Sequence, residues 1–139
     1  MEVSINLWAV LLSGVSSMVI GMVYYHPPVL GNLWMQLAGI NQKRFQKEMP
    51  KLMPLVFVAA LVTAYVIAYV TFLYHSFFGG SWEMAGLTTS LVLWLGLSAT
   101  SLFIHSSMEQ RSSQLLYISL GNRLLSILAM GVILGWLHP

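Results

Sequence analysis

Four long apolar segments limit what this chain can fold into more than any other feature of its sequence. A helix needs about 20 mostly apolar residues to cross a bilayer, and four segments have this character: residues 7–25, 52–77, 85–105 and 115–137. Only 7% of the 139 residues are charged, compared with about 25% in soluble domains. The sequence therefore predicts an all-α fold, an integral membrane four-helix bundle that forms one domain.

The connection between the first two segments carries a second helical pattern. Within residues 29–40, apolar residues recur at near-helical spacing and basic residues follow. The apolar positions are Leu30, Leu33, Trp34, Leu37 and Ile40. We expect a short helix lying in the membrane interface, with Tyr25 and Trp34 as interface anchors. A loop with anchoring aromatic residues is the alternative.

Proline residues mark the expected ends of the first two spans. Proline fixes φ and has no backbone N–H, so Pro27 and Pro28 should end the first helix. Pro50 and Pro54 suit the start of the second helix, where an N–H would be unpaired in any case. The second segment has no continuous polar stripe, and we expect it to be the most lipid-exposed of the four.

Basic residues set the expected orientation, because short loops rich in Lys and Arg stay in the cytoplasm. Four of the six Lys and Arg residues lie within residues 43–51, and Arg111 lies between the third and fourth segments. With four spans, both of these connections lie on one side of the membrane. We therefore expect a multi-pass protein of the cell inner membrane, with both termini outside the cytoplasm.

Polar residues at helical spacing indicate which helix faces line the interior of the bundle, because lipid-facing positions are apolar. The third and fourth segments each carry such a stripe. The resulting candidates for a ligand site or an ion pathway are Ser98, Ser101, His105 and Glu109 on the third segment and Asn122, Arg123 and Ser126 on the fourth.

Arg123 is the most informative of these candidates. It lies about 12–16 Å from the end of its predicted helix, at 1.5 Å per residue, and a charge at such depth is rarely without a role. At matching depth the third segment presents Ser98 and its neighbours, while all four carboxylates lie near the ends of spans. Arg123 could be held by hydroxyls and carbonyls, extend toward water or lipid phosphate, bind an anionic ligand, or contact another subunit.

Glycine residues indicate where helices pack closely. Gly131 and Gly135 form a GxxxG pair, which lets a second helix approach, within the molecule or from another copy. Gly14 and Gly21 form a similar strip of small residues on the first segment.

The composition excludes several kinds of chemistry. The chain has no cysteine, so thiol catalysis and disulfides are excluded. The four histidines lack metal-site spacing, the nine methionines form no tight cluster, and no cofactor motif is present. His105 and Glu109 could share a hydrogen bond, but no nucleophile accompanies them. The net charge of +2 reflects one basic loop and not a nucleic-acid surface. We expect no cofactor, no metal, no catalytic residues and no nucleic-acid partner.

Two stretches carry a family resemblance. The first is Tyr24-Tyr25-His26-Pro27 followed by Gly31 and Trp34, and the second runs from Gly86 through Trp94-Leu95-Gly96-Leu97 to Thr100 and Glu109, with Met130-Gly131 beyond it. Together they resemble the bacterial membrane family catalogued as domain of unknown function 1761. That family typically shows an aromatic-Tyr-Ser-Pro turn, then Phe-Gly and a Trp, and later a Trp-hydrophobic-Gly-Phe segment. This chain has His26, Leu30 and Leu97 in place of the Ser and the two Phe residues of that pattern. The resemblance implies a small four-span inner-membrane protein without an established activity.

Three functions compete on this basis. The first is a non-enzymatic homo-oligomeric component that binds or passes a small solute or lipid, and it rests on Arg123 and the polar stripes. The second is an accessory subunit of a larger membrane complex, favoured by the small size and the GxxxG face. The third is a membrane-embedded enzyme that uses His105 and Glu109 on a lipid-soluble substrate.

Overall fold

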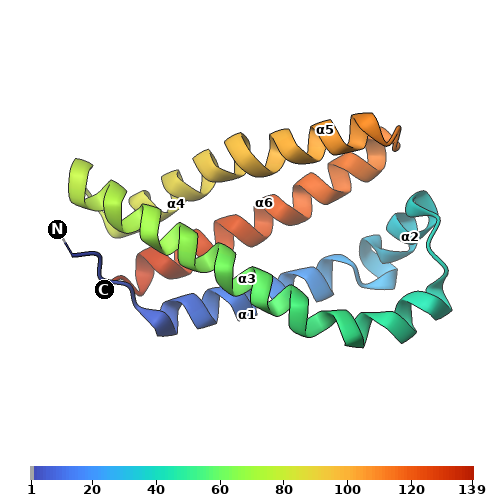
Figure 1. The fold of residues 1–139 in the computed structure, drawn as a ribbon, viewed down its shortest axis with the longest axis horizontal. Coiled ribbons are helices and arrows are strands. Elements are labelled where there is room, and N and C mark those ends of the chain that lie inside the picture. The colour runs from blue at the N-terminus through green and yellow to red at the C-terminus, as the bar shows by residue number, and fades with distance from the viewer. Residues whose placement is uncertain (1) are drawn as a thin grey trace.

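Asparagine and serine side chains begin the four long helices of this chain. In the computed structural model, which describes residues 2–139, each of these side chains accepts a hydrogen bond from a backbone N–H of the first turn. The caps are Asn6, Asn41, Ser81 and Ser112. The helices that follow are α1 (Leu7–Tyr24), α3 (Gln42–Phe78), α4 (Trp82–Leu93), which continues through the π-helical turn η2 (Trp94–Ala99) into α5 (Thr100–Met108), and α6 (Ser113–Trp136) (Figure 1).

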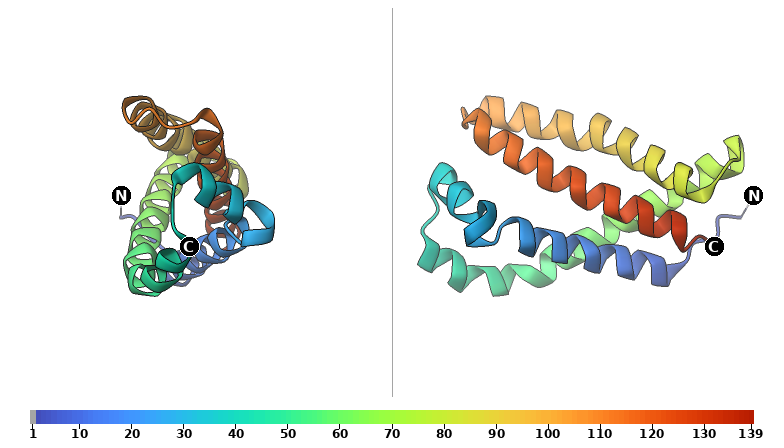
Figure 2. Two further views of the ribbon diagram at one scale, coloured as in Figure 1. Left: turned by 90° about the vertical axis from the view of Figure 1, so that its right-hand side faces the viewer. Right: turned by 180° about the vertical axis from the view of Figure 1, so that it is seen from behind.

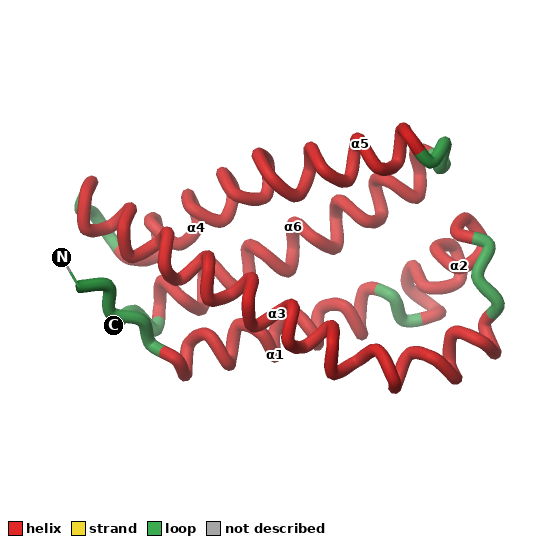
Figure 3. Tube along the Cα trace, viewed as in Figure 1, coloured by secondary structure: helices red, strands yellow, loops and turns green. Residues whose placement is uncertain are grey.

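These four helices are each long and apolar enough to cross a membrane. Helices and loops account for all of the described chain, without a strand (Figure 3). The prediction of an all-α fold with four long apolar helices is therefore confirmed. The third helix is longer than the predicted segment 85–105 at both ends, since it begins at Trp82 and ends at Met108.

A helical segment also covers most of the predicted range 29–40, and it begins two residues before that range. It consists of the π-helical turn η1 (Pro27–Gly31) and the helix α2 (Asn32–Ala38). The Gly31 N–H donates to the His26 carbonyl at 3.1 Å, and a Cβ on Gly31 would overlap the backbone of Tyr25 and His26. Only glycine fits this tight turn, which sends the chain sideways from α1 into α2.

The second long helix begins ten residues earlier than predicted. The charged residues assigned to a loop form its first turns, where Arg44 pairs with Glu48 one turn later at 3.0 Å. Pro50 and Pro54 therefore lie inside α3 and not at its start. Each proline removes one helical hydrogen bond, and α3 bends in this part of its course (Figure 1).

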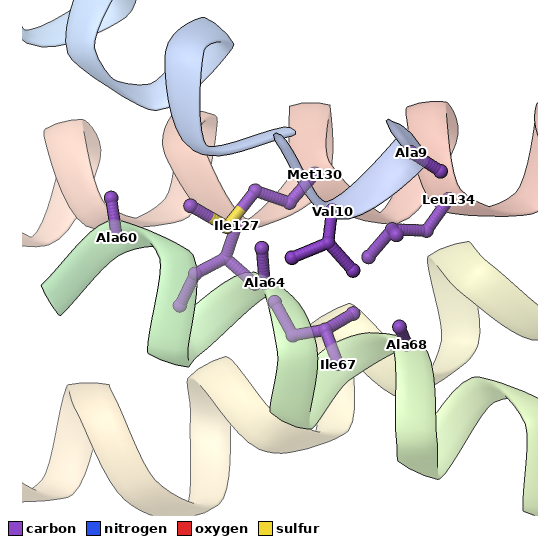
Figure 4. Packing of buried hydrophobic residues seen from close by; sticks show 9 residues of the cluster. All are labelled: Ala9, Val10, Ala60, Ala64, Ile67, Ala68, Ile127, Met130 and Leu134. Atoms are coloured by element: carbon purple, nitrogen blue, oxygen red, sulfur yellow. The ribbon is translucent and has the colours of Figure 1, made fainter. Parts of the chain in front are cut away.

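Helix α6 is the centre of the fold, since it packs against α1, α3 and α4. The apolar core lies where α1, α3 and α6 meet (Figure 4). Alanines one turn apart on α3 let these helices come together: Ala60, Ala64 and Ala68. The expectation that α3 is the most exposed helix is therefore wrong, because small apolar residues form its packing face. The third long helix has the smallest buried share instead.

Glycines bring α4 and α6 into backbone contact. A Cβ on Gly86 of α4 would overlap the Gly131 carbonyl of α6, and a Cβ on Gly135 would lie 2.7 Å from the Trp82 carbonyl oxygen. The GxxxG face is thus covered within the molecule. On α1, Gly14 lies against Leu61 of α3, whereas Gly21 has open space beside it and makes no such contact.

The helices converge at one end of the bundle and separate at the other. The termini meet at the first end, where the Asn6 side-chain amide donates to the Leu137 carbonyl at 2.9 Å (Figure 1). At the opposite end, η1 and α2 lie across the bundle when it is viewed along its long axis (Figure 2). At this end a cavity lies between the helices, lined by residues of α1, α2, α3 and α6.

The contact between α4 and α6 predicts the effect of adding one methyl group. We expect Gly86→Ala to lower the free energy of unfolding by about 1–3 kcal/mol, because overpacked helices must move apart. Gly96→Ala is the matched control, since a Cβ at Gly96 meets no atom within 4 Å. Reversible denaturation in mild detergent measures both values. Equal stabilities for the two variants would contradict the close approach.

Candidate functional site

Arg123 lines a cavity of about 440 Å³ between α1, α3 and α6. Two other predicted candidates, Asn122 and Ser126, line the same cavity from the same face of α6. Tyr25 and His26 line it at the exit of α1, and Ser17 contributes from inside α1. The structure thus gathers six polar side chains around one space.

The guanidinium of Arg123 has no partner within residues 2–139. Its side chain is exposed toward the cavity and takes part in no hydrogen bond or ion pair there. The other ion pairs of the described chain join Arg44 to Glu48 and Arg111 to Glu109. Arg123 is therefore not the fully buried cation expected from its position in an apolar segment, because the helices separate beside it.

Polar groups with free bonding capacity surround this cation. The Asn122 side-chain carbonyl is buried and accepts no hydrogen bond from residues 2–139. Burial raises the pKa of the Tyr25 hydroxyl, one residue beyond α1, while the nearby Ser119, Arg123 and Asn122 side chains act in the opposite direction. The hydroxyl of Tyr25 therefore remains protonated at neutral pH and can donate a hydrogen bond beside Arg123.

A tyrosine clamp holds the end of α1 against α6 at this site. The Tyr24 hydroxyl donates to the Ile118 carbonyl at 2.8 Å. The Tyr24 side chain crosses α6 at Gly121, where a Cβ would lie 2.6 Å from the Tyr24 hydroxyl oxygen. The glycine leaves room for the clamp, and the clamp places Tyr25 and His26 at the rim of the cavity.

An aromatic row closes one side of the cavity. The ring centroids of Tyr25 and Trp34 lie 5.0 Å apart, and those of Trp34 and Phe45 lie 5.5 Å apart. The row links the α1 exit, α2 and the start of α3, and all three residues line the cavity. Tyr25 and Trp34, predicted as interface anchors, are thus partly buried members of this wall.

Four methionines form much of the remaining wall. Met18 and Met22 project from α1, and Met49 and Met53 project from α3. These methionines form no cluster in the sequence, because the two pairs are far apart along the chain. The M-x-x-x-M spacing within each helix was the available signal, since residues four apart share a helix face.

The candidates on the third long helix lie away from Arg123. Ser98 and Ser101 do not line the Arg123 cavity, and Ser101 is exposed. His105 and Glu109 line a separate space of about 50 Å³, and no hydrogen bond joins them in the described chain, where Glu109 pairs with Arg111. The predicted stripe assumed α-helical spacing, which does not hold across the π-helical turn η2.

Comparison with known proteins identifies a family but no activity. A family model described as "Protein of unknown function (DUF1761)" matches residues 8–135, nearly the whole chain, and confirms the resemblance. No curated protein and no solved structure matches the chain. The two stretches that resemble the family lie in different places. The Tyr25–Pro27 turn lines the cavity, whereas Trp94 begins η2 and packs against the core.

The absence of a partner for Arg123 predicts how the fold responds to its loss. We expect Arg123→Gln to change the free energy of unfolding by no more than about 0.5 kcal/mol, because it breaks no contact within the described chain. Tyr24→Phe is the comparison, and it should lose about 1 kcal/mol with its hydrogen bond to α6. Denaturation in mild detergent measures both. A larger loss in Arg123→Gln than in Tyr24→Phe would assign Arg123 a structural role.

Proposed function

The chain belongs to the DUF1761 family, and we propose that it is a membrane-embedded, non-enzymatic protein that binds a small anionic ligand in the Arg123 cavity. The observation that carries this proposal is a cation without a partner in a space of about 440 Å³. Ligand sites commonly have volumes of about 300–1,000 Å³ and a few convergent polar groups. Arg123 supplies the charge, while Tyr25 and Asn122 supply hydrogen bonds.

The proposal places the protein in the cytoplasmic membrane of a bacterium. The four long apolar helices support insertion, and the basic residues support the orientation. The start of α3, which holds residues 43–51, and the connection from α5 to α6, which holds Arg111, both lie at the α2 end of the bundle (Figure 1). The positive-inside rule assigns this end to the cytoplasm. The cavity then opens near the inner leaflet, and both termini lie outside. Arg123 lies about 15 Å along α6 from Ser113, where an ionised side chain commonly has a functional role.

The contents of the cavity favour binding over catalysis. General acid–base catalysis needs groups that exchange protons beside the reacting atoms. His26 lines the cavity, but no carboxylate or second histidine of residues 2–139 lines it with His26, and the predicted His105–Glu109 pair lies outside it. One chain provides the whole lining, and α4 already covers the GxxxG face, so the proposed site does not depend on a homo-oligomer.

Anion binding predicts a stabilisation that depends on Arg123. We expect sodium phosphate, at ionic strength matched with sodium chloride, to raise the unfolding temperature of the purified protein in neutral detergent. A ligand at ten times its dissociation constant raises the free energy of unfolding by about 1.4 kcal/mol. Arg123→Gln should lose the effect, whereas Arg111→Gln should keep it, because Arg111 already pairs with Glu109. The same response in all three proteins would refute anion binding at Arg123.

The orientation predicts which residues react from outside the cell. The chain has no cysteine, so Ser4→Cys and Lys47→Cys each introduce one thiol at an exposed position. We expect a membrane-impermeant maleimide to label Ser4→Cys on intact cells and Lys47→Cys only after lysis. The unsubstituted chain controls for background labelling. Labelling of Lys47→Cys on intact cells would show that the opposite orientation is correct.

A further inference from the structure

We propose that the ligand of the Arg123 cavity is a single-chain anionic amphiphile, whose head binds Arg123 and whose hydrocarbon tail lies against the four methionines. The head is a carboxylate or a phosphate ester, since both offer oxygen atoms to a guanidinium. This inference rests on the proposed function and extends it from the charge of the ligand to its shape.

The two walls of the cavity differ in chemistry. Asn122, Arg123 and Ser126 line it from α6, and Tyr25 and His26 add polar groups at the α1 exit. The facing surfaces of α1 and α3 are mostly apolar, since they carry the four methionines and Val56, with Ser17 as a hydroxyl on α1. A ligand that satisfies both walls must itself have a charged part and an apolar part.

The methionines favour a flexible tail over a rigid ring. Met18 and Met22 lie one turn apart on α1, and Met49 and Met53 lie one turn apart on α3, so each pair presents two thioethers on one face. Methionine is unbranched and polarisable and fits irregular apolar shapes. Four of the nine methionines of the chain line this one cavity, which gives it a lining able to follow a bent chain.

Other occupants satisfy the cavity less well. A small hydrophilic anion would meet Arg123 but leave the methionine wall against water, and the hydrophobic effect disfavours that arrangement. A soft metal ion would suit thioethers, but the unpaired charge of Arg123 in the same space repels a cation. A volume of about 440 Å³ lies low in the range of ligand sites and suits one chain better than a multi-chain lipid.

A basic approach to the cavity supports an anionic head. Trp34, Phe45 and Met49 also line a neighbouring space of about 560 Å³ between α2 and the start of α3, so the two spaces share a wall. Arg44 and Glu48 line the neighbouring space as an ion pair. Lys43 and Lys47 are exposed on the same turns of α3, so these turns carry a net positive charge that attracts an approaching anion.

Photolabelling locates the tail directly. The probe is palmitate with a diazirine in mid-chain, and its neutral control is the alcohol of the same chain. Both are irradiated with the purified full chain in neutral detergent, and adducts are mapped by mass spectrometry. We expect the carboxylate to label residues 18–22 and 49–53, and we expect unlabelled palmitate to compete. The adduct yield should fall at least tenfold in Arg123→Gln and persist in Arg123→Lys, which keeps the charge.

Methionine variants test the apolar wall separately. Met18→Gln with Met53→Gln keeps side-chain length but makes the wall polar, and we expect it to reduce labelling at least threefold. Met108→Gln, at an exposed position at the end of α5, is the control and should leave labelling unchanged. Size-exclusion profiles confirm that each variant is folded.

The outcomes separate this inference from the proposed function. Adducts spread over exposed apolar residues, without dependence on Arg123 or on the carboxylate, would overturn the amphiphile. If phosphate still stabilises the protein through Arg123, anion binding stands and only the tail is wrong. If neither phosphate nor palmitate depends on Arg123, both proposals fail.

Discussion

The arrangement of this bundle depends on the backbone contact between α4 and α6. Gly86, Gly131 and Gly135 provide no side chains at the crossing, so carbonyl and Cα atoms meet directly. This contact places α6 in the centre of the bundle, where it also packs against α1 and α3. The alanines of α3 then complete a core with the larger apolar side chains of α6, such as Ile127, Met130 and Leu134.

Close packing at one end of the bundle accounts for the cavity at the other. Small residues concentrate toward the end where the termini meet, including Ala9, Gly14, Ala64 and Gly135. At the opposite end, the Tyr24 clamp joins α1 to α6 while α2 and the bent start of α3 occupy the periphery. The helices converge at one end only, and the space that remains at the other end is lined mainly by longer side chains.

Arg123 lies where this separation gives it room but no acidic partner. The nearby groups are hydroxyls and amides, and the Asn122 carbonyl is itself unpaired within the described residues. An unpaired cation weakens a fold or contributes nothing to its stability, and natural proteins often sacrifice stability at functional sites. On these features we propose that the site binds an anion that the chain does not supply.

The sequence by itself determined the helices and the group on α6. The long apolar segments and the low charge predict long apolar helices, and the 3.6-residue repeat places Asn122, Arg123 and Ser126 on one face before any neighbour is known. The predicted polar stripe of the third helix was wrong because the helical period changes at η2. The predicted start of α3 was wrong because its charged first turns were assigned to a loop.

Only the tertiary structure decided what faces Arg123. The methionine pairs of α1 and α3, the Tyr25–Trp34–Phe45 row and the exclusion of Ser98 and Ser101 all follow from how helices cross. Helix crossings depend on side-chain volumes summed over several contacts at once, such as the meeting of Gly86 with Gly131. No local pattern in one helix contains that information, so the partners of a residue on another helix become known only from the assembled bundle.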